Sequence, residues 1–419
     1  MKTRAVRLYG KGDLRLEEFE LPPMGEDEIL ARIVSDDLCM SSYKAAMQGA
    51  DHKRVPNDVA ENPVIIGHEF CGEILEVGKK WKDNYRPGQK FTVQPALNYR
   101  GDLSAPGYSY RWLGGDATYV VIPNDIMEKG GLLTFEADAF YIGSMSEHMS
   151  CVAGTFHAMY HIPRSSYVHE MGVKPGGSMA ILAGTGPMGL AAIDYILHCD
   201  RRPGLLVVTG TNAGRLARAA SVLSPEDAAK NGVELRYVNT KGLDDIPAAL
   251  LAENGGKGYD DVLVFAPVTP IVEQGDAILG EDGCLNFFAG PTDKEFSARF
   301  NFYNVHYGGS HVVGTSGGNL DDMRESLDMM AAGLVDPAKI ITHIGGLNCA
   351  AETTLRLPDI PGGKKLIYTH IDMPLTAIAD FGELGKTDPL FARLHEICER
   401  NNGLWCAEAE RVLLEEKTI

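Results

Sequence analysis

The spacing of three glycines constrains the fold of this chain most strongly. Gly184, Gly186 and Gly189 follow the apolar run Met179–Ala183 and precede a helical pattern over Pro187–His198. After a strand and before a helix, glycines at these intervals allow a tight turn and let a diphosphate approach the helix N-terminus. A glycine-rich turn without a ligand is the alternative. We predict a dinucleotide site formed by Gly184, Thr185, Gly186, Pro187, Met188 and Gly189.

Beyond residue 174, apolar strands alternate with helices. This alternation predicts an α/β fold, in which a doubly wound parallel sheet of six strands is covered on both faces. The expected strands are Met179–Ala183, Leu205–Val208, Leu235–Val238, Val262–Phe265, Cys284–Phe288 and His311–Gly314, and the expected helices include Pro187–His198 and Ala213–Val222.

The first 125 residues have a different pattern, in which short strands are separated by Pro/Gly turns, so this region is predicted to be β-rich. Helices are expected near the C-terminus, where residues 371–419 would form a lid, a subunit contact or a packing extension. The N-terminal strands include Ile29–Val34, Glu73–Val77, Lys90–Val93 and Ala117–Ile122, and the late helices are Asp321–Ala332, Pro389–Arg400 and Cys406–Glu415.

Length and composition exclude several classes of protein. A chain of 419 residues is long enough for two or three domains. Its net charge of -18 argues against a nucleic-acid partner, whose phosphates require a basic face. The eight scattered cysteines form no C-x-x-C pair, which is typical of reduced thiols. With neither a signal peptide nor an apolar run of about 18–20 residues, we expect a cytoplasmic protein with no membrane partner.

The second strand of the predicted sheet bears on the choice of cofactor. An NAD site usually carries an acid about 20 residues past the glycines, where it holds the ribose 2′-hydroxyl. Here the strand ends in Thr209-Gly210-Thr211-Asn212, without a carboxylate. Gly210, Thr211, Asn212 and Arg215 would therefore accommodate a 2′-phosphate, which favours NADP(H) over NAD(H). The alternative is that Arg215 only solvates a helix face.

A second set of residues has the chemistry of a metal site. Catalytic zinc takes three Cys, His, Asp or Glu ligands and keeps one position open. Cys39, His68 and Glu147 form such a set, with Glu69 as an alternate carboxylate and His148 as a competitor of Glu147. A metal there would polarise a ketone and stabilise the alkoxide that hydride transfer creates.

These motifs together resemble the zinc-dependent medium-chain dehydrogenase/reductase superfamily over about residues 1–370. The matching stretches are Gly67-His68-Glu69, Cys39-Met40-Ser41 and Glu147-His148-Met149-Ser150. The resemblance implies zinc ligands at Cys39, His68 and Glu147, with Glu69 as an acidic neighbour and Ser41 as a proton relay. It also implies a GroES-like catalytic domain (1–165), a Rossmann domain (166–316), a return to the first domain with a C-terminal extension (317–419), and a homodimer or homotetramer.

The chain also departs from that family. Met40 and Ser42 replace the common Gly and Asp, so the surroundings of the first ligand must differ. Lys44 stands where relatives often have a relay histidine, and it would either bind an anionic substrate or only be solvated. The four-cysteine lobe of many relatives is missing between Phe91 and Gly115, so we expect one catalytic zinc and no structural zinc.

Further stretches resemble the L-sorbose 1-phosphate reductase branch, which implies reduction of a ketose 1-phosphate to a hexitol phosphate. Phosphate would then need cationic side chains, and Arg100, Arg111 and Lys44 are candidates, with Tyr99 and Tyr110 as donors. Three rivals remain: an NAD-dependent polyol or secondary-alcohol dehydrogenase, a metal-free reductase, and a binding protein without activity. The stretches are Asn98–Arg100, Ala105–Arg111, Gly114–Thr118, Asn286–Pro291 and Pro361–Lys365.

Overall fold

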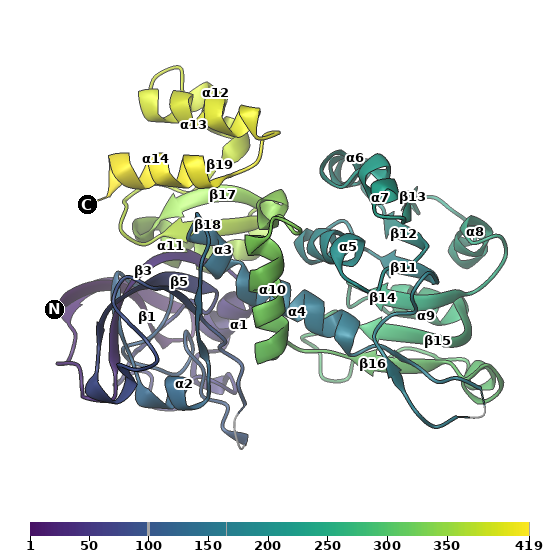
Figure 1. Cartoon of the computed structure of the whole chain (residues 1–419), viewed down its shortest axis with the longest axis horizontal. Coiled ribbons are helices and arrows are strands. Elements are labelled where there is room, and N and C mark those ends of the chain that lie inside the picture. The colour runs from purple at the N-terminus through teal and green to yellow at the C-terminus, as the bar shows by residue number, and fades with distance from the viewer. Residues whose placement is uncertain (99–100, 165, 419) are drawn as a thin grey trace. The chain divides into compact units, whose positions relative to one another are not determined.

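The computed structural model describes residues 1–98, 101–164 and 166–418, and the chain divides into two units (Figure 1). Unit 1 contains Met1–Met149, Asn319–Gly333 and Pro337–Ile419, so both ends of the chain contribute to it. Unit 2 contains Ser150–Gly318 and Leu334–Asp336. Tyr99 and Arg100, two of the residues proposed for phosphate, lie outside the described residues.

Unit 2 is built on a six-stranded parallel sheet. Its strand order is β13-β12-β11-β14-β15-β16, the 3-2-1-4-5-6 order of a doubly wound dinucleotide-binding fold, so the predicted fold class is confirmed. Every residue of the central strand β11 is buried, as expected for a strand with helices on both faces. The elements are β9 (Tyr160–His161), β10 (Glu170–Met171), β11 (Ser178–Leu182), α5 (Pro187–His198), β12 (Leu205–Gly210), α6 (Ala213–Val222), α7 (Pro225–Lys230), β13 (Glu234–Asn239), α8 (Ile246–Glu253), β14 (Tyr259–Val264), α9 (Thr269–Ala277), β15 (Leu279–Phe287) and β16 (His311–Gly314).

Unit 1 contains the predicted β-rich region and adds strands from the second half of the chain. One sheet has the order β2-β1-β4, and a larger one runs β19-β17-β18-β3-β5-β6-β8, with β7 also paired to β3. The strands are β1 (Lys2–Gly10), β2 (Asp13–Glu20), β3 (Ile29–Asp37), β4 (Val64–Ile65), β5 (Phe70–Val77), β6 (Lys90–Val93), β7 (Tyr119–Ile122), β8 (Leu132–Phe135), β17 (Ile341–Gly346), β18 (Lys364–Tyr368) and β19 (Thr376–Ala377).

The helices of unit 1 come from both halves of the chain, and α4 (Ser146–His157) contains the point where the chain passes into unit 2. None of the helices in the described ranges combines the length and apolar character that a membrane crossing requires. The unit 1 helices are α1 (Met40–Gln48), α2 (Asn124–Glu128), α3 (Tyr141–Ser144), α10 (Leu320–Ala331), α11 (Leu347–Leu355), α12 (Phe381–Leu384), α13 (Pro389–Arg400) and α14 (Ala407–Lys417).

Strand β3 organises unit 1, because its C-terminal end is flanked by two strands that are distant in sequence. Asp36 pairs with Phe70 at the start of β5, and on the other edge it pairs with Ile367 of β18. The backbone bonds Asp37 N to Glu69 O (3.0 Å) and Leu38 N to Lys365 O (3.0 Å) extend this register. The residues around 37–39, 68–69 and 364 are therefore brought together by sheet pairing.

The C-terminal extension is joined to unit 1 through a buried carboxylate. Glu410 of α14 is 3% exposed and accepts hydrogen bonds from the backbone N–H groups of Phe140 (2.6 Å) and Tyr141 (2.9 Å), at the start of α3. It also accepts one from the Tyr368 hydroxyl (2.8 Å), to which Trp405 Nε1 donates in turn (2.8 Å). The open question of residues 371–419 is answered in part, since Glu410 of α14 caps the helix α3 of unit 1.

We predict that Glu410→Ala lowers the free energy of unfolding by about 2–4 kcal/mol, because two buried amides and a buried hydroxyl lose their acceptor. The matched control is Glu408→Ala in the same helix. Glu408 makes an exposed ion pair with Arg400 at 3.0 Å, and its removal should cost less than about 1 kcal/mol. Denaturant unfolding of both variants measures the difference, and equal losses would show that the buried network contributes little.

Candidate active site

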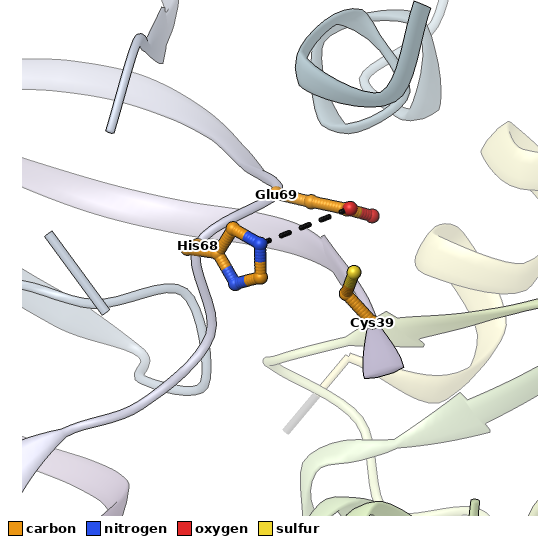
Figure 2. A group of neighbouring side chains, drawn as sticks. All are labelled: Cys39, His68 and Glu69. Atoms are coloured by element: carbon orange, nitrogen blue, oxygen red, sulfur yellow. Dashed lines mark ion pairs between the residues drawn. The ribbon is translucent and has the colours of Figure 1, made fainter. Parts of the chain in front are cut away.

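Cys39, His68 and Glu69 converge in unit 1 (Figure 2). One ligand atom from each lies within 4.8 Å of the others. Cys39 follows β3 as the N-cap of α1, where its Sγ accepts a hydrogen bond from Ser41 N (3.5 Å). His68 and Glu69 immediately precede β5, the strand that pairs with β3. The antiparallel register therefore places the two sequence motifs side by side.

The ring of His68 is oriented by two hydroxyl groups. Its Nδ1 is hydrogen-bonded to Ser42 Oγ (3.0 Å), and its Nε2 lies 3.1 Å from the Tyr108 hydroxyl and 3.9 Å from Glu69 Oε1. Ser42, which replaces the Asp that is common in the family, therefore supplies the hydrogen-bond partner of the His68 nitrogen that faces away from Glu69 and Tyr108. Burial, and then the nearby cations Lys364 and Arg54, lower the pKa of His68 to about 4. A neutral imidazole at physiological pH is the form that binds metals.

A buried lysine holds the carboxylate of Glu69. Lys364 Nζ lies 2.6 Å from Glu69 Oε2 and 2.7 Å from Asp37 Oδ2, and all three side chains are at most 8% exposed. Burial alone would raise the pKa of Glu69, but the Lys364 ammonium holds it below its ordinary value. Glu69 therefore stays ionised although it is buried.

The donor set fits a divalent zinc ion. Burial raises the pKa of the Cys39 thiol, and the Glu69 carboxylate raises it further, so a thiolate there needs an adjacent cation. Sulfur, imidazole nitrogen and carboxylate oxygen are the ligands that zinc takes in catalytic sites. The three residues would hold zinc, and its charge would let Cys39 and Glu69 be ionised together.

Glu147 and His148 lie close to this group, on the first turn of α4. Both are buried, and the charge of Glu147 contributes to the raised pKa of Cys39, so its carboxylate lies near the thiol. Within the described residues, however, the carboxylate that joins Cys39 and His68 is that of Glu69. His148 groups with Asp37 and Glu69, and its buried Nε2 has no hydrogen-bond partner among the described residues.

The other candidates from the sequence are distributed more widely. Ser41 is exposed on α1, two residues after Cys39, and Lys44 is half-buried on the same helix. Tyr110 donates to Asp125 Oδ2 (2.5 Å), and the exposed Arg111 lies over the ring of Trp112 (5.2 Å). Tyr110 and Arg111 thus make these contacts with residues of unit 1 other than Cys39, His68 and Glu69. Arg100 lies outside the described residues.

Four residues at this site were assigned no role from the sequence alone. Ser42, Tyr108, Lys364 and Arg54 each act on the Cys39–His68–Glu69 group, by a hydrogen bond or by charge. The basic run His52-Lys53-Arg54 was a usable signal for Arg54. The contact between Lys364 and Glu69 could not be predicted from the sequence, because 295 residues separate them.

The glycine loop of unit 2 has the predicted setting. It lies between β11 and α5, with Gly186 as the N-cap and Pro187 in the first turn of the helix. A Cβ on Gly189 would collide with the backbone of Gly184, so this glycine permits close helix–strand packing. β12 ends at Gly210, and the following Thr211, Asn212 and Arg215 are exposed, with Asn212 Oδ1 capping α6 through Arg215 N (3.0 Å).

A histidine–aspartate group in unit 2 is already satisfied by protein atoms. His161, Asp282 and His311 have ligand atoms within 4.8 Å of one another. The nitrogens of His161 contact Asp282 O (3.0 Å) and Asp261 Oδ1 (3.2 Å), and those of His311 contact Gly309 O (2.8 Å) and Tyr160 O (2.5 Å). All four ring nitrogens are engaged, so this group is a hydrogen-bond network.

A pair of buried carboxyls lies behind the Gly67-His68-Glu69 turn. Asp36 and Asp116 are both 0% exposed, and none of their oxygens receives a hydrogen bond from a donor group in the described part of the chain. Asp36 packs closely against Gly67, whose φ is +90°. A Cβ on Gly67 would collide with the Asp36 carboxyl. Burial raises the pKa of Asp116 to about 7, and burial and Asp116 raise that of Asp36. A proton shared by the two carboxyls would supply the missing donor.

Comparison with known proteins identifies the family. Residues 25–131 match the alcohol dehydrogenase GroES-like domain. The chain is 52% identical to L-sorbose 1-phosphate reductase of Klebsiella pneumoniae, over 98% of this chain and 97% of that protein. It is 49% identical to mannitol-1-phosphate 5-dehydrogenase of Aliivibrio fischeri, over 99% and 98% respectively.

The chain belongs to the medium-chain dehydrogenase/reductase superfamily, in the L-sorbose 1-phosphate reductase branch. The predicted resemblance is confirmed, and the protein is an oxidoreductase. Among solved structures, 2R,3R-butanediol dehydrogenase from Bacillus subtilis has the same fold, with a TM-score of 0.70, 21% identity, and coverage of 87% of this chain and 99% of that one.

The Asp36–Asp116 pair predicts a pH dependence of stability in this dehydrogenase. An unfolded aspartate has a pKa near 3.9, whereas the folded state holds its proton to higher pH. The proton's contribution to the free energy of unfolding is therefore present at low pH and is lost as pH rises from about 4 through 7. Asp116→Asn supplies a permanent donor, and should raise the free energy of unfolding at pH 8.5 by roughly 1–3 kcal/mol over wild type.

Denaturant unfolding at pH 5.5 and 8.5 measures this effect, with the exposed Asp58→Asn as control. The Asp116→Asn advantage should shrink at the lower pH. If Asp116→Asn is less stable than wild type by the same amount at both pH values, the two carboxyls do not share a proton.

Proposed function

We propose that the protein is a zinc-dependent NADP(H) oxidoreductase that reduces a ketose 1-phosphate, such as L-sorbose 1-phosphate, to a hexitol phosphate. The convergence of Cys39, His68 and Glu69 carries this proposal, because a thiolate, an imidazole and a carboxylate at one point form a zinc site of the catalytic type. The phosphorylated substrate is supported by the two relatives that are about half identical to this chain, since both are named for sugar or polyol phosphates.

Zinc at this site would supply a Lewis acid that polarises the substrate carbonyl for hydride transfer from the nicotinamide. Cys39, His68 and Glu69 would hold the ion, Ser42 would fix the tautomer of His68, and Lys364 would keep Glu69 ionised.

The proton for the product oxygen needs a separate path. The exposed Ser41 hydroxyl, in the first turn of α1 after Cys39, would pass it from solvent. Glu147, buried near the Cys39 thiol, would serve as a further ligand or as an acceptor beside the metal.

The cofactor preference is proposed from the end of β12. Its tip carries no carboxylate to repel a 2′-phosphate, and Thr211 and Arg215 are exposed there beside the glycine loop. Arg215 would pair with the phosphate, and Thr211 would donate to it, which favours NADP(H) over NAD(H).

A second candidate reaction is oxidation of a hexitol 1-phosphate at carbon 5, which the mannitol-1-phosphate 5-dehydrogenase relative favours. The metal and hydride chemistry is the same in the two cases. They differ in the position of the carbon that reacts relative to the phosphate.

The test is the initial rate of NADPH oxidation with L-sorbose 1-phosphate and with free L-sorbose, and of NADP⁺ reduction with mannitol 1-phosphate. We expect kcat/KM for the phosphate ester to exceed that for free L-sorbose by at least roughly 100-fold, because a charge-assisted phosphate contact contributes about 1.5–3 kcal/mol for each bond. Equal rates would indicate a polyol dehydrogenase for unphosphorylated substrates, and faster turnover of mannitol 1-phosphate would favour the second candidate.

We also predict that each chain binds one zinc equivalent and that Cys39→Ser loses it. The kcat of this variant should fall at least roughly 1000-fold, since a Lewis acid contributes several kcal/mol. Metal analysis of purified protein and activity after chelation and zinc restoration measure this. Cys406→Ser, at a half-buried thiol of the C-terminal extension, is the control and should keep its zinc. Two zinc equivalents in wild type, or full activity of Cys39→Ser, would contradict the assignment.

A further inference from the structure

Arg54 is held in place at both its backbone and its side chain. Its carbonyl oxygen accepts a hydrogen bond from Ser109 Oγ (2.6 Å). Its guanidinium donates from Nη1 to Leu103 O (2.7 Å) and from Nη2 to Asn98 Oδ1 (2.9 Å). These bonds use two of the five N–H donors of an arginine. The half-buried guanidinium is therefore positioned before any ligand binds.

A continuous set of contacts links Arg54 to the proposed metal ligands. Arg54 N donates to His52 Nδ1 (3.4 Å), and the His52 ring stacks on Tyr108, with centroids 5.6 Å apart and planes at 13°. The Tyr108 hydroxyl lies 3.1 Å from His68 Nε2.

The residues near His52 are positively charged, although the protein as a whole is acidic. Burial, and then the charges of Lys53, Arg54 and Lys44, lower the pKa of His52, so three cations act on this ring. Across the described ranges, no carboxylate lies within 4.0 Å of the charged nitrogens of Arg54 or Lys53. By contrast, Arg4, Arg32 and Arg356 in the same unit each pair with an acid. Within the described residues, Arg54 and Lys53 thus have no carboxylate partner, although the chain has a net charge of -18, and such cations attract an anion to this position.

We infer that Arg54, with Lys44 and His52 beside it, binds the phosphate group of the substrate; this inference rests on the proposed function. In a ketose 1-phosphate the phosphate-bearing carbon is bonded directly to the carbonyl carbon. A site that holds the carbonyl at the metal must therefore hold the phosphate close to the metal ligands. The backbone of Arg54 is linked to the metal ligands through His52 and Tyr108, whereas Arg111 lies over Trp112. A guanidinium also matches a phosphate through paired hydrogen bonds.

The test compares Arg54→Gln and Arg54→Lys with wild type, on L-sorbose 1-phosphate and on free L-sorbose, with NADPH. Arg54→Gln should lower kcat/KM for the phosphate ester by roughly 30- to 300-fold, mainly through KM, and change that for free L-sorbose by less than about 3-fold. Arg54→Lys should recover part of the loss, because it restores the charge without the paired donors. Arg86→Gln, at another arginine of unit 1, is the control and should leave both values unchanged.

The outcomes separate this inference from the proposed function. If wild type does not prefer the phosphate ester, the proposed function fails and the inference fails with it. If wild type prefers the ester and Arg54→Gln keeps that preference, only the Arg54 assignment is overturned. Equal losses on both substrates would assign Arg54 a structural role in holding Asn98 and Leu103, and would overturn the inference as well.

Inorganic phosphate gives a second measurement if Arg54→Gln does not fold. It should inhibit wild type competitively against L-sorbose 1-phosphate, and its inhibition constant should rise at least roughly 10-fold in Arg54→Lys. An unchanged inhibition constant in that variant would overturn the assignment.

Discussion

The burial of negative charge at the end of β3 is the constraint on which the catalytic unit depends. Asp36, Asp37, Glu69 and Asp116 are each at most 1% exposed, and isolated buried carboxylates would be strongly destabilising. The Lys364 ammonium between Asp37 and Glu69 is one compensation, and a proton shared by Asp36 and Asp116 would be a second. Zinc on Cys39, His68 and Glu69 would be the third, so in the proposed enzyme the metal would contribute to the stability of the site as well as to its chemistry.

This arrangement depends on which strands lie next to β3. Its antiparallel partners β5 and β18 bring His68 and Glu69 from one side and Lys364 from the other. The C-terminal extension adds a further connection, because Glu410 caps α3, and the Ser144 hydroxyl of that helix donates to Ser35 O (3.0 Å) in β3. The residues that hold the site are thus spread from β3 to α14, and a truncated chain would lose part of their support.

The electrostatic pattern divides the site into two parts. Buried acids and a thiol lie around the proposed metal, whereas the charges of Arg54, Lys53 and Lys44 act on His52, whose ring stacks on Tyr108. A phosphorylated ketose has a matching division, with a carbonyl oxygen that needs a Lewis acid and a dianionic phosphate that needs cations. The same division explains why His68 is neutral, because burial and the neighbouring cations both disfavour its charged form.

The sequence by itself determined the doubly wound fold and the strand–turn–helix setting of the glycine loop, because these depend on local spacing and periodicity, and a family resemblance made Cys39 and His68 candidates. The predicted bounds of α5, α6 and α13 agree with the structure for the same reason. The tertiary structure decided that Glu69 lies with Cys39 and His68, that Tyr110 and Arg111 make their contacts elsewhere, and that Lys364 and Arg54 act on the site. These are long-range pairings, and they depend on strand register and buried charge, which no local pattern of residues records.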